Sequence, residues 1–231
     1  MWIDGDGIFV LCRDQLMRLT DFNNDGEADF YECFSNAMIS SPAGHDFICD
    51  LQRDNSGNFY TVSGNQGLLQ ISSDGHKANV LATGFRNPDG LGILHEDTLT
   101  VPCSEGDWTP ASMICAVDIS PFPLSEVVSE HGDSTTPAFF GYGGPRSSQP
   151  PQLPMVYLPR GLDNSSGGQA VVPQGVWGPL AGQLLHLSFG AGSWSTILID
   201  SVDGQLQGGL APIVGDFLSG VHRGRFNRRD S

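Results

Sequence analysis

Histidine, arginine and asparagine occur in two short segments where their neighbours suit proton and anion chemistry. His45 stands beside Asp46, and a histidine next to a carboxylate can act as a general base near neutral pH. A buried, hydrogen-bonded structural histidine fits the same pattern. Arg86 and Asn87 stand together in the tight loop GFRNPDGLG, where they can hold a carboxylate or a quinone oxygen through a fixed fork of donors. An arginine that merely bridges two loops fits this pattern equally well.

A third segment, residues 21–32, matches the twelve-residue calcium loop, in which oxygen ligands surround a glycine that allows a sharp turn. The residues at the ligand positions are Asp21, Asn23, Asp25, Asp29 and Glu32, and Gly26 is the turn glycine. Calcium takes six or more hard oxygen atoms, which this loop can supply. Strand-like runs flank the loop instead of helices, so a hairpin turn rich in Asp and Asn is the alternative. If calcium binds, it stabilises the loop.

Residues 158–169, LPRGLDNSSGGQ, form a polar, glycine-rich segment around Arg160. We expect this segment to line a surface pocket, because it follows a long proline-rich stretch. It is not a phosphate-binding loop, since it lacks the Gly-Lys-Ser or Gly-Lys-Thr signature. The sequence also contains no HExxH, GxSxG or GxGxxG motif, which excludes zincin, α/β-hydrolase and Rossmann-type enzymes.

The chain is strongly acidic, with a formal net charge of −15 from 26 acidic and 11 basic side chains. A field this negative repels phosphate backbones, and the only basic cluster is a short one near the end of the chain, Arg223, Arg225, Arg228 and Arg229. We therefore exclude nucleic acid as a partner. No stretch of about 18 apolar residues occurs, so no membrane span is expected.

The elements that must position these residues are predicted to be short strands. Asp-Gly and Ser-Gly pairs recur along the chain and supply the backbone angles of tight turns. Between residues 58 and 101 the strand centres recur about every ten residues, and no helix-period segment is visible. This pattern predicts an all-β fold, a sandwich, a barrel or a propeller, and residues 57–75 match successive strands of one propeller blade.

One propeller domain is expected over residues 1–231, interrupted by an excursion rich in proline and glycine at 121–168. At about 40–45 residues per blade, a chain of this length covers about five blades. Both ends of the sequence stop within the pattern of strands and turns. We therefore expect an incomplete propeller, a fragment of a longer protein.

Taken together, the motifs resemble those of the pyrroloquinoline-quinone (PQQ)-dependent sugar dehydrogenase-like β-propellers, of the soluble aldose and sorbosone dehydrogenase type. The resemblance is greatest to the divergent planctomycete-type branch of secreted proteins. It covers most of the chain and rests on LTDFNNDGEADFYE, HDF followed by RDNSGNFYTVSGN, GFRNPDGLG, EGDWTPAS, LPRGLDNSSGG and FLSGVHRGRF. The resemblance implies a six-bladed propeller that carries its cofactor over the central channel.

The resemblance also implies roles for single residues. His45 is similar to the general base that takes the proton of the substrate hydroxyl, Arg86 to the residue that polarises the quinone carbonyl, and Asn87 to a cofactor-binding residue. The loop that offers main-chain oxygens to the cofactor's calcium corresponds to Gly106 and Asp107, without the family's proline. For the residues that bind the quinone carboxylates, the stand-ins are Arg160, Arg223 and Arg225.

The function implied is oxidation of a sugar or polyol hydroxyl by hydride transfer to PQQ, with electrons passed to a cytochrome c domain. A periplasmic or secreted location goes with it. The alternative is a catalytically inactive propeller that serves as a carbohydrate-binding or protein-binding module. A third is a calcium-stabilised structural domain of a surface protein.

Overall fold

The computed structural model describes residues 1–5, 7–39, 41, 42, 47–95, 97–120, 136–146 and 148–226. Seventeen strands and one short 3₁₀ helix, η1 (Gly178–Leu180), make up the regular structure of this part of the chain. The expected all-β fold is therefore confirmed. Within the same residues, no helix is long and apolar enough to cross a membrane. His45 and Asp46 lie outside the described residues, as do residues 121–135 of the excursion.

Four sheets follow one another along the chain. The first consists of β1 (Trp2–Asp4), β2 (Gly7–Leu11), β3 (Leu16–Thr20) and β4 (Phe30–Ser35). The second consists of β5 (Cys49–Arg53), β6 (Phe59–Ser63), β7 (Gly67–Ile71), β8 (Ala78–Thr83) and β12 (Ala138–Phe139). The third consists of β9 (Gly92–His95), β10 (Thr98–Cys103), β11 (Met113–Asp118) and β13 (Val156–Tyr157). The fourth consists of β14 (Ser166–Val171), β15 (Leu184–Ser188), β16 (Ser193–Val202) and β17 (Gln205–Pro212).

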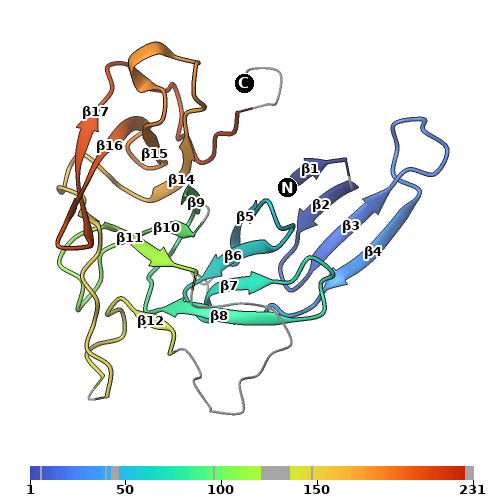
Figure 1. The fold of residues 1–231 in the computed structure, drawn as a ribbon, viewed down its shortest axis with the longest axis horizontal. Helices are drawn as coiled ribbons and strands as arrows, with labels where there is room; N and C mark the ends of the chain where they lie inside the picture. Colours follow the sequence, from blue (N-terminus) through green and yellow to red (C-terminus); the bar gives the residue numbers. More distant parts are fainter. Residues whose placement is uncertain are drawn as a thin grey trace.

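The sheets are arranged as the blades of a propeller, which confirms the predicted architecture (Figure 1). Each blade begins with a strand near the middle of the molecule, and the following strands pair antiparallel toward the outside. The inner strands of neighbouring blades make contact, β1 with β5 and β9 with β14. Short strands joined by tight turns allow this radial arrangement, which is why glycine-containing turns recur through the sequence.

The described residues form four sheets, each a blade, beside the estimate of about five blades from the chain length. Between β11 and β14, the described residues 119–120, 136–146 and 148–165 add two short strands to existing blades. β12 pairs parallel with β8, and β13 extends the third blade beside β11. The many prolines of this stretch lack the N–H donor that a strand ladder needs, which is the physical reason for the difference.

Apolar side chains fill the space between neighbouring blades. In the second blade, Phe59 and Leu69 belong to the cluster shared with the first blade, whereas Tyr60 and Leu68 belong to the cluster shared with the third. Successive residues of a strand point to opposite faces, so a blade between two others buries both of its faces. All the residues of β6 and β7 are accordingly buried.

The third and fourth blades approach closely at a contact between glycines. A Cβ atom placed on Gly90 would lie 2.5 Å from both the carbonyl oxygen of Gly167 and the Cα of Gly168. Next to this contact, the N–H of Gln169 donates to the carbonyl of Leu91 at 3.3 Å. Because backbone atoms stand on both sides, no side chain can rotate away to make room. Glycine at position 90 is what allows the loop before β9 to lie against β14.

We predict that Gly90→Ala lowers the free energy of unfolding by about 1–3 kcal/mol or more, as forced overpacking does. Urea denaturation measures the change. The control is Gly209→Ala in β17, where an added Cβ would meet nothing within 4 Å and the backbone is not in the left-handed region. A Gly90→Ala protein as stable as Gly209→Ala would contradict the prediction.

Candidate functional site

Three of the predicted site residues line a single cavity. Its volume is about 560 Å³, within the usual range for small-molecule sites. The lining residues are Arg86, Asn87, Ser104, Glu105, Ser112, Leu158, Arg160, Gly161, Asp163, Asn164, Ser165, Gly190 and Ala191. They come from the loop before β9, the loop after β10, the segment between β13 and β14, and the turn after β15. The cavity is therefore built by loops of the third and fourth blades.

Arg86 is fixed by backbone groups on both sides. Its Nη1 donates to the carbonyl of Glu105 at 2.7 Å, and its own carbonyl accepts from the N–H of Ser104 at 2.8 Å. Gly106 packs against the Arg86 side chain: a Cβ added at Gly106 would lie 3.0 Å from Cδ of Arg86 and 3.0 Å from the ring of Tyr142. The absence of a side chain at Gly106 thus lets the arginine pack against the loop.

Asn87 takes a left-handed backbone conformation with φ 42°, which asparagine tolerates better than most residues. This conformation places Asn87 on the cavity wall, where its side-chain amide makes no hydrogen bond to any described residue. Gly106 and Asp107, in contrast, do not line the cavity, and Asp107 is exposed. Asn87 is therefore available to a ligand, and Gly106 leaves room for the Arg86 side chain.

Arg160 enters the cavity from the segment between β13 and β14. Its Nε lies 2.9 Å from Oε2 of Glu105, and its Nη2 donates to the carbonyl of Pro110 at 3.4 Å. Glu105 thus contacts both arginines, one through its carbonyl and one through its carboxylate. Sequence reasoning missed Glu105 although it precedes the predicted Gly106, because nothing in the motif says which residue of that loop points inward.

A buried pair anchors the wall that carries Arg160. Nε2 of His186, on β15, donates to Oδ1 of Asp163 at 3.0 Å, and the hydroxyl of Ser166 donates to Oδ2 at 2.6 Å. The side chains of Asp163 and His186 are only 1% and 2% exposed. Burial by itself raises the pKa of the Asp163 carboxyl, but the hydrogen bond and charge of His186, with smaller help from Ser166 and Ser188, leave this pKa below its usual range.

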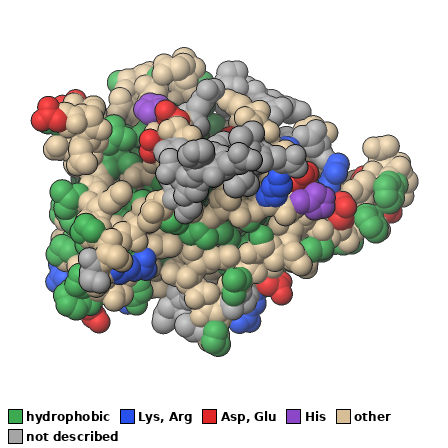
Figure 2. Space-filling model, turned by 60° about the horizontal axis from the view of Figure 1, so that its bottom comes forward, with side chains coloured by type: hydrophobic (Ala, Val, Ile, Leu, Met, Phe, Trp, Pro, Cys, Tyr) green, Lys and Arg blue, Asp and Glu red, His purple; other side chains and the backbone are tan. Residues whose placement is uncertain are grey.

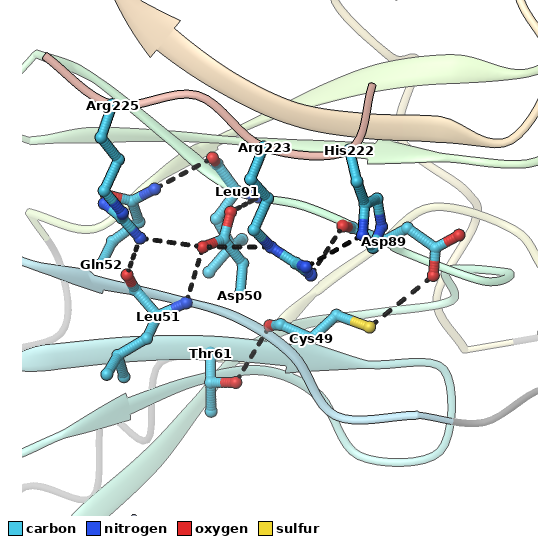
Figure 3. Close-up of polar contacts among 10 residues, drawn as sticks. All are labelled: Cys49, Asp50, Leu51, Gln52, Thr61, Asp89, Leu91, His222, Arg223 and Arg225. Carbon is cyan, nitrogen blue, oxygen red and sulfur yellow. Dashed lines mark hydrogen bonds and ion pairs between the residues drawn. The ribbon is translucent and has the colours of Figure 1, made fainter. Parts of the chain in front are cut away.

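A second group of polar residues, which we call the polar centre, comprises Asp50, Gln52, Asp89, Arg223 and Arg225 (Figure 3). Oδ1 of Asp50 accepts from Nη2 of Arg225 at 3.0 Å and lies 3.6 Å from Nε of Arg223. Arg225 also donates to Oε1 of Gln52 at 3.0 Å, and Arg223 donates to the carbonyl of Asp89 at 3.1 Å. The two late arginines expected to stand near a quinone thus bind Asp50, and neither lines the cavity.

The polar centre and the cavity share one loop. The loop before β9 carries Arg86 and Asn87 at one end, while at the other end the N–H of Leu91 donates to Oδ2 of Asp50 at 3.0 Å. Arg223 holds the same loop through the carbonyl of Asp89. The polar centre, through the buried carboxylate of Asp50, therefore helps to position the residues that face the cavity.

Four of the five predicted calcium ligands, Asp21, Asn23, Asp25 and Asp29, lie in the turn between β3 and β4. Within the described residues, no group of three or more His, Cys, Asp or Glu side chains is placed to hold a metal ion. The loop closes through its own hydrogen bonds: Oδ2 of Asp21 accepts from the N–H of Gly26 at 2.9 Å, and Oδ1 of Asn23 accepts from the N–H of Asp25 at 2.9 Å. The Gly26 N–H is the main reason that the pKa of Asp21 lies below its usual value. Glu32 lies apart on β4, opposite Arg18.

Basic side chains are scarce on the surface. On the face shown in Figure 2 they form small separate groups among neutral and acidic side chains, with no continuous basic area. Arg86, Arg160, Arg223 and Arg225 are all engaged with carbonyl or carboxylate groups of the protein itself. A ligand of the cavity therefore meets guanidinium groups that already have partners.

We predict that Asp163→Asn lowers the free energy of unfolding by about 1–3 kcal/mol, the cost of disturbing a buried carboxylate that accepts hydrogen bonds from His186 and Ser166. Because the folded pKa of Asp163 is depressed, its contribution is complete above the unfolded pKa and is lost as the pH falls through the folded one. The variant should therefore lose less stability than the natural chain between about pH 5 and pH 2. Urea denaturation at several pH values measures both effects.

Asp200→Asn is the control, since that carboxylate is exposed and accepts a hydrogen bond only from the N–H of the neighbouring Ser201 among the described residues. Equal stabilities of the Asp163→Asn and Asp200→Asn proteins at neutral pH would show that the buried pair does not anchor the wall.

Comparison with known proteins supports the fold. No family model and no curated protein matches the sequence. Among solved structures, the chain is similar to a proposed oxidoreductase (glucose dehydrogenase) from Thermus thermophilus, with a TM-score of 0.59 and 16% sequence identity. The match covers 90% of this chain and 63% of that one, so this chain spans less than two thirds of the length of that protein. At this identity the likeness establishes a shared fold.

Proposed function

We propose that this chain is part of a quinone-dependent dehydrogenase that oxidises a hydroxyl group of a sugar or polyol. The observation that carries the proposal is that the adjacent residues Arg86 and Asn87 line one cavity together with Arg160, which lies far from them in the sequence. The distant likeness to a glucose dehydrogenase supports an oxidoreductase. Transfer of the electrons to a cytochrome c domain, in the periplasm or outside the cell, completes the proposal.

The cavity fits an anionic, planar quinone such as PQQ. About 560 Å³ is enough for a fused-ring molecule of that size. Arg86 and Arg160 suit its carboxylate and quinone oxygens, and the unpartnered amide of Asn87 adds a neutral donor. When bound, PQQ supplies the acceptor for the hydride that leaves the substrate carbon.

The residues of the chain have separable roles in this proposal. The Glu105 carbonyl holds Arg86 in place. The guanidinium of Arg86 would then stabilise the negative charge that develops on the quinone oxygen beside it. His45, which lies outside the described residues, is proposed to take the proton of the substrate hydroxyl on a ring nitrogen. The Asp163–His186 pair keeps the opposite wall, with Arg160, in position.

We predict that the protein binds added PQQ and that Arg86→Gln lowers the rate of dye-linked aldose oxidation by about 10²–10³-fold, as loss of a charge-stabilising donor does. Binding is followed by isothermal titration calorimetry and oxidation by dye reduction. Arg13→Gln, in an exposed turn of the first blade, removes the same charge and should leave both measurements unchanged.

His45→Ala should bind PQQ normally but lose turnover, because a base is not needed for binding. If neither PQQ binding nor oxidation is found, the enzyme proposal fails. A catalytically inactive binding module would then be the better description of the chain.

We also propose calcium as a ligand of residues 21–32. The carboxylates of Asp25, Asp29 and Glu32 are exposed, so they can turn toward an ion without disturbing the core. We predict that calcium raises the Tm of the natural chain and that Asp25→Ala abolishes the rise. Differential scanning calorimetry of both proteins in calcium and in EGTA measures the change in Tm. The same Tm in both would leave the loop as a hairpin turn without metal.

A further inference from the structure

The two arginines of the cavity are held by the same residue in different ways. Arg86 donates from Nη1 to the backbone carbonyl of Glu105 at 2.7 Å, and a carbonyl carries no net charge. Arg160 instead lies with its Nε 2.9 Å from the carboxylate oxygen Oε2 of Glu105. The positive charge of Arg86 therefore remains available to a ligand, whereas that of Arg160 is already neutralised.

Among the described residues of the cavity wall, no other acidic group competes for Arg160. Their one other carboxylate is that of Asp163, whose oxygens are engaged by His186 and Ser166 and whose side chain is 1% exposed. Glu105, in contrast, has a side chain that is 43% exposed, and that of Arg160 is 75% exposed. Either side chain can swing into solvent at little cost, because an exposed ion pair contributes at most about 1 kcal/mol, which is roughly a factor of five in an equilibrium constant.

We propose that Glu105 is a specificity-determining residue, an internal counter-ion that a ligand must displace from Arg160. A neutral ligand leaves the Glu105–Arg160 pair intact and gains nothing from Arg160. A monoanion is satisfied by Arg86. A ligand with two or more carboxylates reaches both guanidinium groups and replaces Glu105 on Arg160. Glu105 therefore lowers the affinity of the cavity for a second carboxylate, because that carboxylate must replace Glu105 on Arg160. This inference deepens the proposed function and rests on it.

The test is Glu105→Gln, which removes the carboxylate and keeps the backbone carbonyl that holds Arg86. Asp203→Asn is the charge-matched control, because it removes one negative charge from a remote turn where asparagine followed by glycine is well tolerated. Two anionic probes, PQQ and citrate, are titrated into each protein by calorimetry. In parallel, Arg160 is labelled with phenylglyoxal and the modified peptide is quantified by mass spectrometry.

We expect Glu105→Gln to label at Arg160 about two- to fivefold faster than the control and to bind citrate and PQQ tighter by a similar factor. Equal labelling rates, or anion binding no tighter than in the Asp203→Asn protein, would overturn the inference. If PQQ fails to bind every variant while citrate binding and Arg160 labelling both increase, the proposed quinone function fails and the role of Glu105 stands. The two proposals can thus be told apart.

Discussion

The buried carboxylate of Asp50 is the interaction on which the centre of this structure depends. It accepts hydrogen bonds from Arg225 and from the N–H of Leu91, and Arg223 lies beside it. A buried carboxylate without hydrogen-bond partners is costly. The loop before β9 and the segment after β17 therefore keep the positions in which their groups bind Asp50. Cζ of Arg225 also lies 5.0 Å from the ring centroid of Trp2. This cation–π contact connects the first blade to the polar centre.

The position of the cavity follows from this centre. The loop that Asp50 holds at Leu91 presents Arg86 at its other end, and the glycine contact at Gly90 presses the same loop against the fourth blade. On the opposite side, the Asp163–His186 pair ties the Arg160 segment to β15. Two buried carboxylates thus hold the two walls, and Glu105 stands between the arginines that the walls carry.

Much of this arrangement could be predicted from local pattern. Turn glycines and short apolar runs are read from neighbouring residues, so strands such as β6 and β7 and the propeller class were predicted correctly. Arg86, Asn87 and Arg160 were selected as site residues from their motifs, and the structure brings all three to one cavity. Length suggests about five blades, and it does not show that β12 and β13, between β11 and β14, extend existing blades among the described residues. The metal ligands of residues 21–32 stay a prediction, since loop spacing does not dictate where carboxylates point.

By itself, the sequence determined the class of fold, the turns that shape it and the residue types able to bind an anion. These depend on backbone preferences and on chemistry that each residue carries with it. Only the tertiary structure decided which arginines share a cavity and which are bound elsewhere: Arg160 joins Arg86, while Arg223 and Arg225 bind Asp50. It also decided that Glu105, not Asp107, faces them. The reason is physical. A charged side chain pairs with the partner that the packing of the blades brings within a few ångströms, and the local sequence does not determine the distance between residues on different blades.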